Sequence, residues 1–254
     1  MNETVKNDDF IEISYTGTLK DDKIVFDTTI EAVARKEGLY DSNMTYGPIA
    51  ICIGQGQILP GLDASLEGLE VGKEHDITLS PEHAFGKKDG KLMKLVPTQI
   101  FKKQRINPVT GLQVNIDGAI GTIRTVTGGR TIVDFNHPFS GREVVYKVDI
   151  RRKLTDDKEK VIALLELALN QKKESIGVDI KEGKATISLQ KDFPDQLFDL
   201  LKQRITKILP TIKDVIFNTP KPKQAPKVET SKAAEKAAEK AAEKTPADAV
   251  NKQA

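Results

Sequence analysis

The segment 219–254 sets the strongest limit on what this chain can fold into, because it cannot bury a core. Prolines and an Ala-Ala-Glu-Lys repeat at 233–244 fill it, and almost no large apolar side chain follows Phe217. The repeat places like charges at i,i+4, where they repel, while lysine–glutamate pairs at i,i+3 offset part of this effect. We expect a semi-helical, fluctuating spacer, with a specific binding tail as the alternative, and a folded part within 1–218.

Composition narrows the class of protein further. The 254 residues include 39 basic and 37 acidic side chains, and this balance excludes a nucleic-acid-type polycation. A single cysteine excludes a disulfide framework and a cysteine-rich metal site. The polar segment 1–10 lacks the pattern of a signal peptide, and no apolar run approaches the roughly 20 residues of a membrane span. We therefore expect a soluble, cytoplasmic protein without a membrane partner.

Hydrophobic periodicity predicts an α+β domain in two pieces, 1–86 and 136–154. Alternating apolar residues predict strands, and apolar residues three and four apart predict short helices. The predicted strands are 10–18, 23–28, 49–53, 74–79 and 142–152, and the predicted helices are 29–38 and 62–69. A short helix on an antiparallel sheet is an α+β arrangement.

Residues 87–135 have a different pattern. Seven basic side chains between Lys87 and Arg105 face the single acid Asp89, and three short strands follow at 112–116, 119–126 and 130–135, separated by glycine turns. We predict an all-β module inserted into the first domain. The basic stretch is an RNA-binding candidate, but no aromatic-interleaved motif accompanies it. We favour a solvated face and regard nucleic acid as an unlikely partner.

A third block, 155–218, has αββαβ order. Thr155-Asp156-Asp157 predicts a helix N-cap, a hairpin follows at 176–180 and 185–189, and a helix at 193–209 precedes a strand at 212–217. Three strands leave an exposed edge and a thin core. We therefore expect this domain to form a homodimer through its helices or its sheet edge. The segment 219–254 is the fifth unit of the chain.

Four ordered motifs carry a family resemblance. ISYTGTL at 13–19 with VFDT at 25–28, IGQGQILPGL at 53–62, LEGLEVG at 66–72 and SPEHAFG at 80–86 resemble FKBP-type peptidyl-prolyl cis-trans isomerases. NHPFSG at 136–141 resembles the re-entry segment of the SlyD-like branch. The resemblance implies a half-barrel antiparallel sheet wrapped on a short helix, with 87–135 as an insert-in-flap domain. With 155–218 added, the chain is similar to long archaeal FKBP-type proteins.

The resemblance also implies an apolar pocket for a proline ring. Its residues would be Tyr15, Phe26, Asp27, Ile58, Leu59, Leu62, Phe85 and Tyr146, with Ile49 as a further substrate contact. The Leu59 amide would donate to a carbonyl of the bound peptide. Leu62 stands where many members have Trp, and Phe85 where Tyr is common. Leu62 predicts a smaller and softer pocket floor with doubtful macrolide binding. Phe85 lacks a hydroxyl donor, which predicts weaker positioning of the ligand.

The chemistry fits such a pocket without a cofactor or a metal. Rotation about an Xaa-Pro bond meets a barrier of about 18–20 kcal/mol, and a site that solvates the planar amide poorly favours its twisted form. We expect Asp27 to orient the twisted carbonyl. SlyD-like relatives often end in a His-rich metal-binding tail, but the segment 219–254 contains no His or Cys, so we expect no nickel site. His137 belongs to the re-entry segment, and we expect a structural role for it.

The resemblance assigns the insert to the binding of unfolded or nascent chains that contain Xaa-Pro bonds. The residues offered are Leu92, Met93, Leu95, Val96, Ile100 and Phe101, although Met93 and Phe101 fit the insert's own core equally well. The predicted function is an isomerase with chaperone activity. The alternative is a holdase-type chaperone that binds proline-containing segments without useful turnover.

Overall fold

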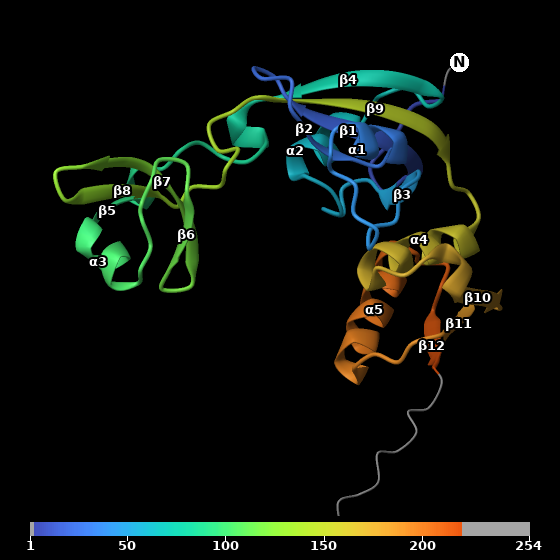
Figure 1. Ribbon diagram of the computed structural model, residues 1–254. Helices are drawn as coiled ribbons and strands as arrows, with labels where there is room; N and C mark the ends of the chain where they lie inside the picture. Colours follow the sequence, from blue (N-terminus) through green and yellow to red (C-terminus); the bar gives the residue numbers. More distant parts are fainter. Residues whose placement is uncertain (1–2, 220–254) are drawn as a thin grey trace, which may run out of the picture.

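The structure is a computed structural model that describes residues 3–219, and it shows a mixed α+β architecture with three separate sheets (Figure 1). The α+β class and the antiparallel first sheet agree with the sequence prediction. Apart from Thr219, the predicted spacer lies outside the described residues. No helix among residues 3–219 is long and apolar enough to cross a membrane.

The first sheet is built around one long strand, β1. Its strands are β1 (Phe10–Leu19), β2 (Val25–Thr28), β3 (Ile49–Cys52), β4 (Lys73–Leu79) and β9 (Val144–Lys153). The order is β2-β1-β9-β4, and β3 also pairs with β1, all antiparallel. One edge of β1 is shared, because Phe10 lies opposite Cys52 of β3 and Thr16 lies opposite Thr28 of β2.

Two short helices accompany this sheet, α1 (Glu31–Lys36) and α2 (Pro60–Leu66). Leu62 and Leu66 of α2 are buried in the same apolar cluster as the inward residues of β1 and β9. The prediction of a helix over 62–69 is shifted, because Pro60 begins the helix, Glu67 is extended and Gly68 has φ +84°. A proline at the first helical position is favourable, and a left-handed glycine ends the helix.

The insert forms the second sheet, which stands to one side of the first (Figure 1). Its order is β5-β8-β7-β6, with β5 (Met93–Pro97), β6 (Gln113–Ile116), β7 (Ala119–Thr127) and β8 (Arg130–Asp134). The all-β prediction is wrong here, because α3 (Thr98–Lys103) follows β5. Phe101 of α3 is 1% exposed in a small core with Val114, Ile123 and Val133. The insert needs this helix because its short strands leave the core open.

The third sheet has the order β10-β11-β12. The elements are α4 (Asp157–Leu169), β10 (Ile176–Lys181), β11 (Lys184–Leu189), α5 (Asp195–Ile208) and β12 (Asp214–Asn218), so the observed succession matches the predicted αββαβ. The Asp156 side chain accepts from the Lys158 amide, which confirms the predicted cap. β12 runs parallel to β11.

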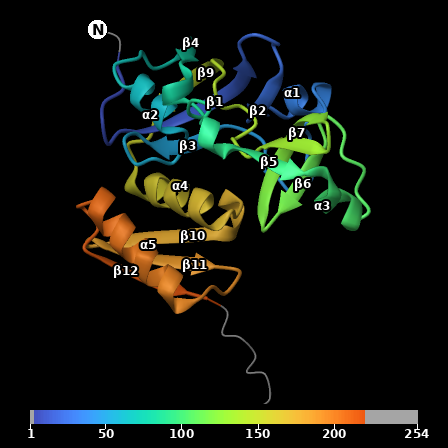
Figure 2. The ribbon, with the colours of Figure 1, turned by 90° about the vertical axis from the view of Figure 1, so that its left-hand side faces the viewer.

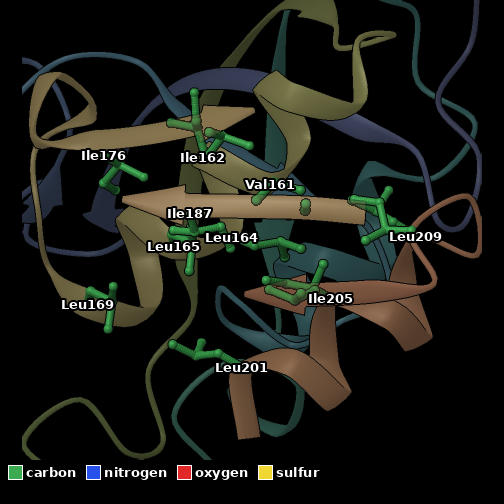
Figure 3. Packing of buried hydrophobic residues seen from close by; sticks show 14 of the residues in the cluster. Val161, Ile162, Leu164, Leu165, Leu169, Ile176, Ile187, Leu201, Ile205 and Leu209 are labelled. Atoms are coloured by element: carbon green, nitrogen blue, oxygen red, sulfur yellow. The ribbon is translucent and has the colours of Figure 1, made fainter. Parts of the chain in front are cut away.

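Helix α4 lies between the first and third sheets (Figure 2). Its residues Val161 to Leu165 are all buried. Figure 3 shows how Val161, Ile162, Leu164 and Leu165 pack in the third block. The same apolar cluster includes Phe10 and Cys52 of the first sheet. Arg152 of β9 adds a polar link, because it donates to Glu12 of β1 and to Glu159 of α4, both at 2.9 Å. The expectation of a thin isolated core is therefore corrected, since the third block shares its core with the first sheet.

Candidate functional site

All nine residues expected at the proline pocket line one cavity of about 580 Å³. They come from β1, β2, β3, β9, α2 and the segments before α2 and after β4. The cavity is also lined by residues that sequence reasoning did not place there: Thr28, Thr29, Met44, Thr45, Tyr46, Gln57, His137, Phe139 and Leu167. Pocket residues separated by more than a hundred positions in the chain thus meet in one concave surface.

The most deeply buried side chains of the cavity are Leu62 and Tyr146, which are 1% and 3% exposed. The Tyr146 ring meets the Tyr15 ring edge-on at 5.8 Å between centroids. Neighbouring Gly17 has no space for a side chain, because a Cβ there would lie 2.8 Å from the rings of Phe26 and Tyr146. The glycine of the ISYTGTL motif is therefore required by ring packing.

Aromatic rings build one wall of the cavity. Phe26 meets Tyr146 at 5.7 Å and Phe85 at 5.5 Å, both edge-on. His137 stacks on Phe85 with 4.7 Å between centroids and 4° between planes, and its Nδ1 accepts from the Phe139 amide at 3.2 Å. The His137 ring also lines the cavity, so this residue belongs to the candidate site in addition to its expected structural role. Rings in this arrangement offer an apolar surface for a flat, saturated ring.

Asp27 is the sole carboxylate among the lining residues of this cavity. The Tyr15 hydroxyl donates to Asp27 Oδ2 at 3.0 Å. Burial raises the pKa of Tyr15, and the negative charge of Asp27 raises it further. Burial and then Asp27 also raise the pKa of Tyr146. Both phenols consequently stay protonated at neutral pH, and Tyr15 acts as a donor that holds the carboxylate in place.

The segment before α2 is fixed by a buried carboxylate, Asp63, which sequence reasoning missed. Its oxygens accept from the amides of Gly54 and Gly56, both at 3.0 Å, and its residue is 5% exposed. These bonds hold the glycine turn that precedes Ile58 and Leu59. Among residues 3–219 the Leu59 amide has no acceptor, so it is available to a ligand.

The two chain segments that lead into and out of the insert meet beside the cavity. The Ser140 hydroxyl donates to the Phe85 carbonyl at 3.0 Å, and the Gly141 amide donates to the Gly86 carbonyl at 2.8 Å. These bonds fix Phe85 at the rim and tie the base of the insert to the pocket.

The client-binding residues expected on the insert divide into two groups. Leu92, Met93, Leu95 and Ile100 are exposed. Val96 and Phe101 are buried in the core of the insert, so the prediction that they offer a binding surface needs correction. Phe101 is held inside by α3, which the sequence analysis did not anticipate. None of the six lines the proline cavity.

The described residues contain no group of three or more His, Cys, Asp or Glu side chains that could hold a metal ion. Cys52 of β3 lies buried in the apolar cluster that includes α4, and burial followed by nearby carboxylates raises its pKa to about 12. This thiol is not poised as a nucleophile.

Comparison with known proteins identifies the class. Residues 1–102 match the family of FKBP-type peptidyl-prolyl cis-trans isomerases, and residues 94–139 match the IF domain of FKBP26. A short-type peptidyl-prolyl cis-trans isomerase of Methanocaldococcus jannaschii is 31% identical over 147 residues, which cover 58% of this chain and 92% of that protein. A probable 16 kDa FKBP-type isomerase of Pseudomonas fluorescens is 28% identical over 115 residues, or 43% of this chain and 75% of that protein.

The chain belongs to the FKBP-type peptidyl-prolyl cis-trans isomerase family, and it is an enzyme of that class. A relative from Aeromonas hydrophila is named SlyD. It is 29% identical over 113 residues, which cover 44% of this chain and 53% of that protein. A second SlyD, from Treponema pallidum, is 31% identical over 127 residues, with 47% of this chain and 70% of that protein covered. These relatives place the chain in the SlyD-like branch of the family.

Proposed function

We propose that the 580 Å³ cavity is the isomerase site and that it acts by favouring the twisted form of an Xaa-Pro amide. The observation that carries this proposal is that the nine expected pocket residues, all apolar or aromatic except Asp27, line one cavity. The planar amide is stabilised by resonance and has a large dipole, so apolar surroundings solvate it poorly. The twisted amide has lost this resonance and much of its dipole, so the same surroundings favour it. A rate gain of about 10⁴ needs only about 5.5 kcal/mol of differential binding.

Each of the nine expected pocket residues has a defined part in this proposal. Leu62, Tyr146 and Phe26 grip the proline ring, with Ile49, Ile58 and Phe85 completing the apolar surface. The Leu59 amide donates to a peptide carbonyl and so fixes the register of the chain. Asp27, held by Tyr15, acts on the polarity of the twisted amide. No proton transfer or covalent intermediate is required.

We propose further that residues 87–135 are an insert-in-flap chaperone domain between the FKBP-type segments 1–86 and 136–154. Support comes from the four exposed apolar residues near β5 and α3, and from β5 itself, which is an edge strand. An open edge can accept an extended client strand. Because the base of the insert is tied to Phe85, a captured client stays near the pocket and its effective concentration there rises.

Deletion of residues 88–135 tests this division of labour. The Gly86–Gly141 hydrogen bond shows that the two chain segments already meet, so a short glycine linker can replace the insert. We expect isomerisation of a tetrapeptide to survive, and refolding of a proline-limited protein to slow by at least tenfold. Equal partial losses of activity on the two substrates would refute the tethering role. A complete loss of activity on both substrates, in a protein that remains folded, would refute the pocket itself.

Tetrapeptide turnover and the Asp27→Ala variant separate the enzyme from a holdase. Leu62 and Phe85 replace larger or more polar family residues, and this observation favours a weaker isomerase that relies on client capture. Suppression of aggregation that ignores Asp27→Ala, together with negligible tetrapeptide turnover, would support the holdase.

We propose that the C-terminal domain, 155–218, forms a homodimer through its sheet edge. The support is that β12 is an edge strand with Ile216 exposed, whereas α4 is already covered by the first sheet. Sedimentation of Ile216→Lys as a monomer beside a dimeric wild type would agree, and a monomeric wild type would refute the proposal. A free, buried Cys52 is in keeping with a cytoplasmic location.

A further inference from the structure

The proline cavity does not end at the first sheet. One of its lining residues, Leu167, belongs to α4 of the C-terminal domain. A second hollow of about 200 Å³ adjoins it, lined by the segment 44–50 and by Glu166, Leu167, Asn170 and Gln171. The two spaces share five lining residues, which are Met44, Thr45, Tyr46, Ile49 and Leu167. The pocket therefore continues as a groove along the contact between the two domains.

The shared wall of this groove carries unpartnered apolar surface. Met44 is 58% exposed and Leu167 is 38% exposed, whereas Leu164, Leu165 and Leu169 of the same helix are buried. Leu167 is thus the one leucine of α4 that faces the groove instead of the core. Exposed apolar side chains beside a binding pocket mark a surface that a ligand can cover.

The position of Leu167 is fixed, not loose. Val161 to Leu165, just before it, are locked in the core between two sheets, and Asn170 ends the helix in the left-handed conformation at φ +47°. Tyr46 holds the opposite side of the groove, because its hydroxyl accepts from the Asp41 amide at 2.9 Å. A contact made with such a preorganised wall loses little entropy on binding.

The next stretch of the groove changes in character. A third hollow of about 460 Å³ shares Thr45, Asn170 and Gln171 with the second, and it is also lined by Asn43, Lys172, Glu174, Ser175, Gln190 and Lys191. Four of its lining residues carry side-chain amides, which both donate and accept hydrogen bonds, as an extended polypeptide backbone requires. The order along the groove is therefore a proline pocket, an apolar step and then a polar stretch in which side-chain amides stand beside charged groups.

The geometry points to a specificity subsite in which Leu167 and Met44 receive an apolar side chain of the substrate polypeptide near its Xaa-Pro bond. This inference rests on the isomerase pocket proposed above. The occupant is an extended polypeptide, because the subsite is continuous with the pocket that takes the proline and leads to amide groups that suit a peptide backbone. The C-terminal domain thus takes part in substrate choice, in addition to any role in association.

Peptide kinetics test the subsite. The substrates are a tetrapeptide with a central Xaa-Pro bond and two longer peptides that extend it with a leucine-containing segment on the amino or the carboxyl side. Each longer peptide has a twin in which serine replaces the leucine. Wild-type protein should prefer one leucine peptide over its serine twin by a lower KM. Leu167→Ser should reduce that preference about fivefold, the effect of losing partial burial of a leucine side chain.

Two further variants make the test decisive. Leu200→Ser changes the same residue type on α5, where it is 63% exposed and does not line the groove, and should leave the preference as in wild type. Leu167→Met keeps an apolar side chain and should restore most of the preference. A wild type that turns over all peptides without distinguishing leucine from serine would overturn the subsite. An equal loss on the tetrapeptide and the longer peptides in Leu167→Ser would overturn it too. A folded wild type without tetrapeptide turnover would instead reject the proposed pocket.

Discussion

The Tyr15 hydroxyl donates to Oδ2 of Asp27 at 3.0 Å, so the carboxylate of the proline cavity is held by the neighbouring strand. The two residues belong to paired strands, β1 and β2. The pairing thus fixes the direction in which the single carboxylate of the cavity points.

Replacing either partner should slow catalysis without unfolding the protein. We expect Asp27→Ala to lower kcat/KM for a tetrapeptide by about tenfold or more, because a preorganised charge beside the reacting amide contributes at least about 1.4 kcal/mol to binding of the transition state. Tyr15→Phe should lower it less, because the carboxylate remains. Exchange NMR on the cis and trans peptide measures both rates. Circular dichroism confirms the fold, and unchanged rates in both variants would contradict the assignment.

Stability should fall at alkaline pH through the buried phenols. The folded-state pKa values of Tyr15 and Tyr146 are raised, chiefly by burial. The unfolded chain therefore releases protons first, and the free energy of unfolding decreases as pH rises above about 10, where unfolded tyrosine ionises. Urea unfolding between pH 8 and 11 measures this slope. Tyr15→Phe should make the slope shallower, and an identical slope would count against a buried, neutral Tyr15.

His137 should contribute to binding through its ring. Removing the stacked ring in His137→Ala should raise KM about three- to tenfold, the range expected for losing one aromatic pair. His137→Phe keeps a ring over Phe85 and should recover most of the loss, although it cannot accept from the Phe139 amide. If the phenylalanine variant is as weak as the alanine variant, the Nδ1 hydrogen bond matters more than the ring.

Cys52 should report on the docking of α4. The thiol is fully buried and its pKa is raised to about 12, so thiol reagents should label the native protein very slowly. Leu165→Ala leaves a cavity in the shared core and should cost about 2–5 kcal/mol of stability. In this variant, thiol reagents should label Cys52 faster than in wild type. Ile123→Ala is the matched control, because it weakens the separate core of the insert and should leave Cys52 protected.

The motifs of the family resemblance predicted the parts of the site that lie inside them. Phe26 lies in VFDT and Leu62 in IGQGQILPGL, and both line the cavity. The ring packing at Gly17 was not predicted, because it requires Tyr146 of β9, which is distant in the sequence. His137 and Phe139 sit in a recognisable segment, but their place at the cavity depends on how the insert's two connecting segments meet. Nothing local to 136–141 encodes that meeting.

The docking of α4 was missed for a physical reason. A helix with one apolar stripe covers one surface, and the prediction assumed such a stripe. The unbroken run Val161 to Leu165 is buried all round, which is the pattern of a helix with neighbours on both sides. This apolar run is the sequence signal for a helix with two neighbours. It does not show that the second neighbour is β3, so the position of Leu167 at the cavity could not be derived from it.

The partnership of β1 with β9 has a consequence for how the chain folds during synthesis. β1 is made early, but its full-length partner is Val144–Lys153, which leaves the ribosome only after the whole insert. The strands of the insert pair among themselves, β5 with β8, β8 with β7 and β7 with β6. The insert can therefore fold while the first sheet is still incomplete. Nascent chains that have emerged from the ribosome beyond β8 but not as far as residue 144 should therefore carry a protease-resistant insert beside an unfinished pocket. The newborn protein then possesses the proposed client-binding module before the proposed catalytic pocket is complete.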